Sequence, residues 1–146
     1  MFSRACGEAA SMIAAIWIGL IVGVSFFAAP IKFTAAGVSL EQLLAVGKVT
    51  FQAFSWIELS AFVLLMTASL IHLTRGVAIS IFLLFLLLLI QKFGILPGLD
   101  SELDRTVAGE TVDETNLHFV YVAIDCVKLA VLFCLSLILR NERVAP

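Results

Sequence analysis

Four apolar blocks, each of about 20 residues, constrain the fold of this chain more than any other feature. An α-helix rises about 1.5 Å per residue, so each block is long enough to cross the roughly 30 Å hydrocarbon core of a bilayer. The sequence therefore predicts an all-α membrane protein, an antiparallel bundle of four transmembrane helices, at residues 9–29, 40–73, 77–96 and 112–140.

The composition indicates that the lipid bilayer is the main binding partner of the chain. Apolar residues make up 62% and charged residues 14% of its 146 positions, which is more apolar surface than a soluble domain of this size can hide. The net charge of -2, with Lys and Arg scattered, excludes a nucleic-acid-binding protein. We expect a single membrane domain over residues 1–146, with no soluble domain attached.

Helix boundaries can be placed from local signals. Pro30 is expected to end the first helix, and Ser39 with Gln42 forms a capping box that opens the second. The segment Phe82–Ile90 has no polar side-chain atom, which predicts a third helix facing lipid. Pro97 is expected to end that helix.

The segment 97–111 is predicted to be an acidic loop outside the membrane. A second capping box, Thr111 with Glu114, is expected to begin the fourth helix in water. Basic residues are densest next to the helix ends on the side of the termini, which predicts that both termini are cytoplasmic. These residues are Arg4, Arg75, Arg140 and Arg143.

Three ionisable residues lie deep inside apolar blocks, where a charge costs at least about 2.5 kcal/mol. Counted from the start of their blocks, Glu58 and Asp125 each lie about 12 Å from the same side of the membrane, and Lys128 lies one turn deeper. The second and fourth helices run parallel to each other. We therefore predict that Glu58, Asp125 and Lys128 form a buried cluster between these two helices.

Polar residues extend this cluster into two stripes at helical spacing, which are expected to satisfy each other. The stripes consist of Lys48, Gln52, Ser55 and Glu58 on the second helix, and His118, Tyr121, Asp125 and Lys128 on the fourth. Two interpretations stay open: the residues pair helices, or they form a ligand, proton or ion site.

Small residues at Ala15, Gly19 and Gly23 give the first helix a smooth strip that another helix can approach closely. Packing within the chain is the simpler interpretation, and self-association is the alternative. Trp17, which lies within this helix, is interpreted as a packing residue.

No catalytic motif is found, so no catalytic residue, metal ligand or cofactor is predicted. A bis-histidine haem within one chain is excluded by geometry, because His72 and His118 are expected at opposite ends of the bundle. A conventional hydrolase or a nucleotide-driven pump is excluded on the same motif evidence.

Several short motifs follow one another along most of the chain: Trp17-Ile18-Gly19, Phe26–Phe33, Gly47–Phe51, Leu96-Pro97, and Leu117–Tyr121 with Lys128. In these motifs the chain resembles small bacterial four-helix membrane proteins of unknown function related to the transmembrane protein 205 family. The resemblance implies a four-helix protein of the bacterial inner membrane. A fainter similarity to anthrone-oxygenase-like membrane proteins, through the first helix, implies redox chemistry, but no catalytic residue can be matched to it.

The function predicted from these observations is that of a non-enzymatic helix bundle, either a homo-oligomer or a subunit of a larger membrane complex. The main alternative is an oligomeric small transporter or ion-handling protein that uses Glu58, Asp125 and Lys128. A membrane oxidoreductase is a third interpretation.

Overall fold

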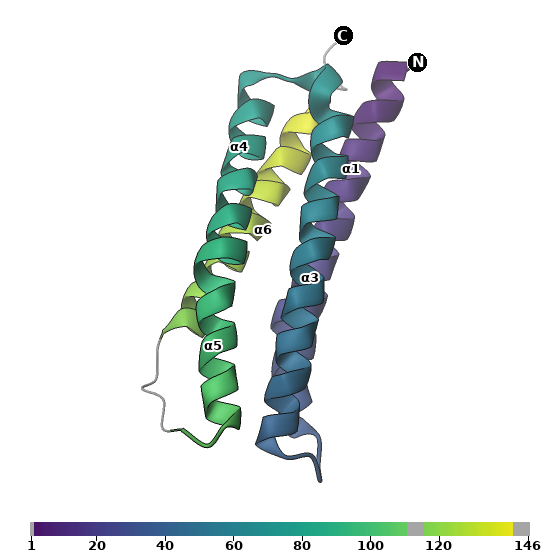
Figure 1. Ribbon diagram of the computed structural model, residues 1–146. Helices are drawn as coiled ribbons and strands as arrows, with labels where there is room; N and C mark the ends of the chain where they lie inside the picture. The colour runs from purple at the N-terminus through teal and green to yellow at the C-terminus, as the bar shows by residue number, and fades with distance from the viewer. Residues whose placement is uncertain (1, 111–115, 142–146) are drawn as a thin grey trace.

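The protein is a bundle of four long antiparallel helices (Figure 1). The computed structural model describes residues 2–110 and 116–141, with side chains from residue 6 onward. Four helical stretches in these residues are long and apolar enough to cross a membrane: Cys6–Thr34, Leu40–His72, Arg75–Val107 and Leu117–Asn141. The predicted fold class is confirmed, and the chain is a small integral membrane protein.

The first span is longer than predicted. It consists of α1 (Phe2–Ile21), the π-helix η1 (Val22–Ala28), the short α2 (Ala29–Ile31) and the 3₁₀ turn η2 (Lys32–Thr34). The expectation that Pro30 ends the helix is wrong. Pro30 occupies the first turn of α2, directly after the wide π turn, where a missing N–H and a ring against the preceding backbone are tolerated.

The second span begins where the capping box predicted. In α3 (Leu40–Ser69), the Gln42 N–H donates to Ser39 Oγ (3.3 Å) and the Ser39 N–H donates to Gln42 Oε1 (3.2 Å). A 3₁₀ turn, η3 (Leu70–His72), completes the span. The capping box thus sets where α3 starts, and with it the depth of every polar residue along the helix.

The third span contradicts the predicted boundary. It contains α4 (Arg75–Leu89), the π-helix η4 (Ile90–Ile95) and α5 (Leu96–Val107), so the predicted acidic loop 97–111 is helical over most of its length. Pro97 lies in the first turn of α5, again directly after a π-helix. The predicted capping box at Thr111 and Glu114 lies outside the described residues.

The third helix is only partly lipid-facing. Residues Ser80, Leu84 and Leu88 are buried on one face, and this face leads to Gln91 in η4, which is also buried. The opposite face, with Phe82 and its neighbours, is exposed. The predicted lipid-facing wall is therefore correct for one face of α4 and wrong for the other.

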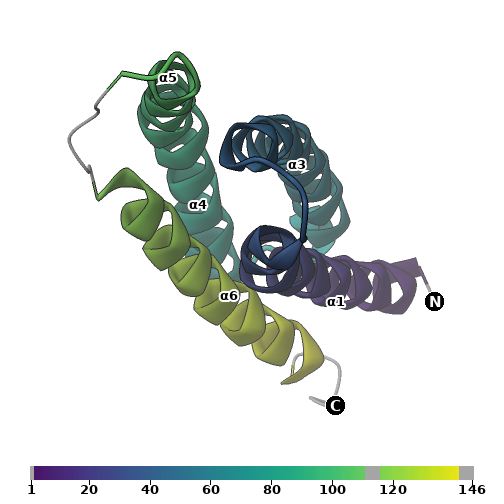
Figure 2. The ribbon, with the colours of Figure 1, turned by 90° about the horizontal axis from the view of Figure 1, so that it is seen from below.

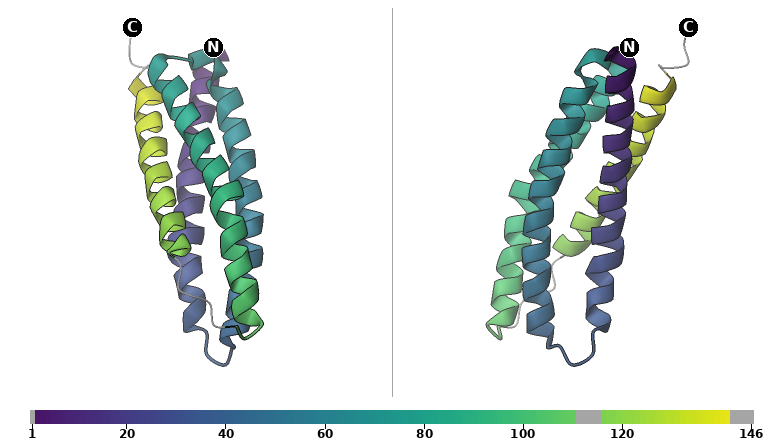
Figure 3. Two further views of the ribbon diagram at one scale, coloured as in Figure 1. Left: turned by 60° about the vertical axis from the view of Figure 1, so that its left-hand side comes forward. Right: turned by 90° about the vertical axis from the view of Figure 1, so that its right-hand side faces the viewer.

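The fourth span, α6 (Leu117–Asn141), closes a ring of neighbours in which α1 packs on α3 and α6, and α4 packs on the same two helices (Figure 2). Both termini and the turn between α3 and α4 lie at one end, which we call the terminal end. An apolar core fills that half of the bundle, around Ile21, Leu65, Leu84 and Leu132. Towards the other end, the loop end, the helices spread apart (Figure 3).

The small-residue strip of the first helix faces outward. Ala15, Gly19 and Gly23 are all exposed, and a Cβ atom added at either glycine would meet no atom of another side chain or helix within 4 Å. The interpretation that this strip packs within the chain is therefore wrong for the described part of the protein.

Candidate functional site

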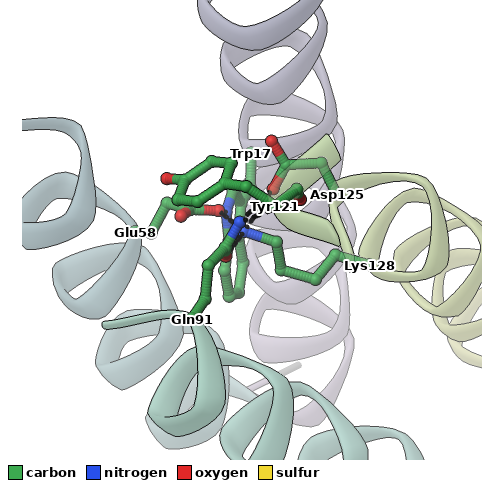
Figure 4. A network of polar contacts seen from close by, with 6 residues as sticks. All are labelled: Trp17, Glu58, Gln91, Tyr121, Asp125 and Lys128. Atoms are coloured by element: carbon green, nitrogen blue, oxygen red, sulfur yellow. Dashed lines mark hydrogen bonds and ion pairs between the residues drawn. The ribbon is translucent and has the colours of Figure 1, made fainter. Parts of the chain in front are cut away.

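The ammonium group of Lys128 is the centre of a polar cluster inside the bundle (Figure 4). It donates to Glu58 Oε1 and to Gln91 Oε1 (2.6 Å), and it lies 2.8 Å from Asp125 Oδ1. An ammonium group has three protons to donate; two of them go to Glu58 and Gln91, and the carboxylate of Asp125 adds an ion pair. Lys128 is thus paired within this cluster.

A second set of hydrogen bonds surrounds this centre. The Trp17 indole N–H donates to Glu58 Oε1 (3.1 Å). The Gln91 amide donates to Asp125 Oδ1 (2.8 Å) and to the backbone carbonyl of Tyr121 (3.3 Å). Trp17 comes from α1, Glu58 from α3, Gln91 from η4, and Asp125 from α6, so every span contributes a side chain to the cluster.

The cluster is sealed from solvent and carries unequal charge. Asp125 and Lys128 are 0% exposed and Glu58 is 1% exposed. Two carboxylates face one ammonium, so the fully ionised cluster has a net charge of -1. Asp125 Oδ2 and the Tyr121 hydroxyl are buried and have no hydrogen-bond partner in the described structure. Within that part of the chain, Lys128 is the only cation that forms an ion pair with these two carboxylates.

The predicted contact of Glu58, Asp125 and Lys128 is confirmed. It forms because α3 and α6 run parallel and place the three residues at matching depths, as their spacing from the start of each apolar block implied. Whether the three residues bind a ligand or an ion stays a prediction.

Sequence reasoning missed two members of the cluster. Trp17 was interpreted as a packing residue. A buried indole N–H needs a hydrogen-bond acceptor, and this requirement could have indicated that Trp17 contacts a polar group such as Glu58. Gln91 follows directly after a long apolar run, which marked it as a polar residue inside the membrane. Its direction could not be read from the sequence, because it lies in a π-helix, where the ordinary helical spacing does not apply.

The outer parts of the two predicted stripes do not pair with each other. Lys48 binds Asp104 of α5 (2.6 Å), and the Gln52 amide donates to Asp100 of the same helix (2.8 Å). The predicted contact with the fourth helix is wrong here, because α5 extends the third span along α3 and supplies carboxylates to it.

Ser55 likewise contacts a residue outside the predicted set, Lys92. It accepts a hydrogen bond from Lys92 (3.0 Å) and donates to the backbone carbonyl of Gln52 (2.8 Å). The Lys92 ammonium also lies 3.6 Å from the ring centroid of Trp56. A small cavity of about 30 Å³ adjoins Glu58 and Lys92, enough room for about one water molecule.

Tyr121 is one of the two rings of an aromatic barrier, and His118 lies on the cavity side of that barrier. Tyr121 is buried and packs edge-on against Phe51, with ring centroids 5.1 Å apart. His118 is exposed and lines a cavity of about 520 Å³ at the loop end, which Phe51 also lines. Along α3 and α6 the order is the same: cavity, aromatic pair, then cluster.

The histidines and acidic residues do not assemble into a metal or haem site in the described residues. His72 follows α3 at the terminal end, and His118 begins α6 at the loop end, as expected. No group of three His, Cys, Asp or Glu side chains placed to hold a metal ion occurs in residues 6–110 and 116–141.

No family model matches the chain, and comparisons with curated proteins and with solved structures find no match.

Proposed function

We propose that this membrane protein is non-enzymatic and binds an exchangeable proton in the Glu58–Asp125–Lys128 cluster as part of proton or ion handling across the bilayer. The observation that carries this proposal is the charge of the cluster: two carboxylates and one ammonium, all buried, with one carboxylate oxygen unpartnered. Binding one proton makes this cluster neutral.

The energetic argument rests on the cost of an unpaired charge in a low-dielectric interior. An isolated buried charge costs many kcal/mol, and two carboxylates that share a site do not both ionise without compensation. The other groups that face the carboxylates are the Trp17 indole, the Gln91 amide and the Tyr121 hydroxyl, and none of these three is cationic. The Lys92 ammonium shares the small cavity with Glu58, but it contacts Ser55 and the Trp56 ring and forms no ion pair with either carboxylate among the described residues. In this proposal, one carboxyl group of the cluster therefore holds the proton.

A route to this proton is expected from the loop end. The cavity lined by His118 reaches Phe51, and the Phe51–Tyr121 pair separates it from the cluster. If both termini are cytoplasmic, the cavity opens on the extracytoplasmic side. A rotation of these two rings would join the cavity to the cluster.

Proton flux in proteoliposomes tests the proposal. The protein is reconstituted into vesicles that contain a trapped pH-sensitive dye, and an imposed pH gradient is followed with and without a potassium diffusion potential. Wild-type protein should dissipate the gradient faster than protein-free vesicles, and Glu58→Gln and Asp125→Asn should abolish the difference. Asp104→Asn, which removes an exposed carboxylate on the loop side, is the matched control and should keep wild-type flux. Equal flux in wild-type and empty vesicles would refute the proposal.

The working unit is proposed to be an oligomer, because four helices around a filled core leave little room for a path through one copy. The exposed Ala15, Gly19 and Gly23 strip is the surface that favours close approach of a second copy. In a variant in which the three native cysteines are replaced, Ala15→Cys should form a disulfide-linked dimer in membranes. Phe133→Cys, in which the cysteine lies at an exposed site on α6 instead, should not form this dimer. Equal crosslinking at both sites, or crosslinking at neither, would refute the interface.

Membership of the transmembrane protein 205 relatives, residence in a bacterial inner membrane and cytoplasmic termini also stand as proposals. The orientation is tested by fusing a reporter that is active only in the cytoplasm to the C-terminus. The redox alternative is tested by a visible absorption spectrum of the protein purified from its native membrane. A haem or flavin band would favour the oxidoreductase over the proton-handling protein.

A further inference from the structure

The cavity at the loop end contains a cation that has no anionic partner in the described chain. Lys32 lies in η2, is half-buried and lines the cavity. Its ammonium group lies 4.9 Å from the ring centroid of the adjacent Phe33, and no carboxylate of the described residues forms an ion pair with it. Lys48, on the same side of the membrane, differs because its ammonium is occupied by Asp104.

Lys32 points inward rather than outward. A lysine near the end of a membrane helix normally extends its ammonium group toward water. Here the ammonium lies over Gly47 of α3, and a Cβ atom at position 47 would be 2.0 Å from it. Gly47 therefore makes room for the charge inside the cavity.

A buried hydroxyl faces the same space. Ser25 lies in the π-helix η1, is 7% exposed, lines the cavity, and its Oγ has no hydrogen-bond partner. Several other hydroxyls of this chain, including those of Ser60 and Ser80, donate to a backbone carbonyl of the preceding turn. The Ser25 hydroxyl is left available, and His118 adds an imidazole to the cavity wall.

The rest of the wall is apolar. It consists of Phe26, Phe33, Phe51, Leu44, Leu99 and Leu103, together with smaller residues of α2. Leu99 and Leu103 turn the apolar face of α5 toward the cavity, while its acidic residues Asp100 and Asp104 are engaged by α3. Among the described residues, no acidic side chain lines the cavity, so these residues combine positive charge and hydrogen-bond donors with hydrocarbon surface.

We propose that this cavity binds an amphiphile with one anionic head group, a carboxylate or a phosphate on a hydrocarbon body, taken from the bilayer. The head group is held by Lys32, Ser25 and His118, and the hydrocarbon lies against Phe26, Phe33 and Phe51. A volume of about 520 Å³ lies within the usual range for small-molecule sites. The cavity is the one proposed above as the proton's route, but amphiphile binding does not require the proton-binding cluster, from which the Phe51–Tyr121 pair separates it.

Native mass spectrometry of the detergent-solubilised protein tests the site with three probes: oleate, phosphatidylglycerol and neutral dioleoylglycerol. Oleate or phosphatidylglycerol should form a one-to-one adduct, and the stronger of the two identifies the source of the anion. Lys32→Gln should weaken that adduct roughly tenfold or more, because a charge-assisted contact is lost. Lys48→Gln, a lysine removed on the same side, should bind as the wild type does.

A second pair of variants tests the geometry without removing charge. Gly47→Ala displaces the Lys32 ammonium and should weaken the adduct, whereas Gly94→Ala, at a glycine with open space, should not. The proposal is overturned if dioleoylglycerol binds as tightly as the anionic probes, if Lys32→Gln leaves binding unchanged, or if Lys48→Gln weakens it equally.

Discussion

Lys128 and Lys32 show how the same side chain serves two regions of one bundle. Lys128 lies in the sealed interior, where it donates hydrogen bonds to Glu58 and Gln91 and forms a second ion pair with Asp125. Lys32 lies in the cavity at the loop end, where no carboxylate pairs with it in the described chain. The difference lies in the partners: the charge of Lys128 is paired inside the cluster, whereas the charge of Lys32 has no paired carboxylate in the described chain and is the one that we propose binds an anion.

The largest effect on stability is expected at Lys128. Lys128→Met leaves two carboxyl groups without their cation, and breaking a buried ion pair costs about 3–5 kcal/mol. The free energy of unfolding, measured in mixed micelles with increasing sodium dodecyl sulfate, should fall by that amount. Lys32→Met should change it by less than about 0.5 kcal/mol, because that lysine has no ion pair to lose among the described residues. Equal losses of unfolding free energy in the two variants would contradict the difference proposed between Lys128 and Lys32.

The double variant Glu58→Gln with Lys128→Met sharpens this result. If Glu58 and Lys128 stabilise each other directly, the double variant should recover at least about 1 kcal/mol relative to the sum of the single losses. Strictly additive losses would mean that the two residues act through separate contacts.

A smaller loss is expected at Gln91, which bridges Lys128 and Asp125. Gln91→Leu should lower the free energy of unfolding by about 1–3 kcal/mol, because it leaves buried polar groups unsatisfied. Gln52→Leu, at an exposed glutamine that bonds only to Asp100 by its side chain, is the matched control and should cost less than about 1 kcal/mol. The reverse order would show that the amide in η4 is not part of the stabilising cluster.

Trp17→Phe should cost still less. It keeps most of the ring packing and removes only the N–H that donates to Glu58, and hydrogen bonds inside membrane bundles average about 0.6 kcal/mol. The same unfolding measurement on Trp56→Phe, at an exposed ring, provides the baseline. A loss of several kcal/mol at position 17 would mean that the indole does more than donate one hydrogen bond.

The smallest effect is expected at the exposed Lys48–Asp104 pair. Lys48→Gln should change the free energy of unfolding by less than about 1 kcal/mol, and the change should shrink at high salt. A large, salt-independent loss would place this pair among the buried contacts.

The four spans and the contact of Glu58 and Asp125 with Lys128 could be predicted from the sequence, because both follow from counting residues along each helix. Apolar block length fixes the number of crossings, and distance along each helix brings Glu58 and Asp125 to one depth. These predictions depend on helix rise alone, which hardly varies.

The errors have a common physical origin in two prolines. Pro30 and Pro97 were expected to end helices, but each follows a π-helix and continues the span. Hydrophobic patterns do not reveal π turns, so α5 and the direction of Gln91 could not be anticipated. Lys48 and Gln52, the outer part of the α3 stripe, therefore contact α5 instead of α6. The Gly19 strip faces outward because α1 packs on α3 and α6 through its other faces, and small residues alone do not specify which face of a helix is packed.

Infrared spectroscopy of the carboxyl groups tests the central claim, that the cluster holds a proton, most directly. The folded wild type at neutral pH should show the carbonyl band of one protonated carboxyl group, shifted by deuterium exchange. Glu58→Gln and Asp125→Asn should each remove the band, because one carboxylate then remains to match one ammonium. Asp100→Asn, which alters another partly buried carboxyl group, should keep it. A wild type without this band, or a band that survives either cluster replacement, would contradict the account.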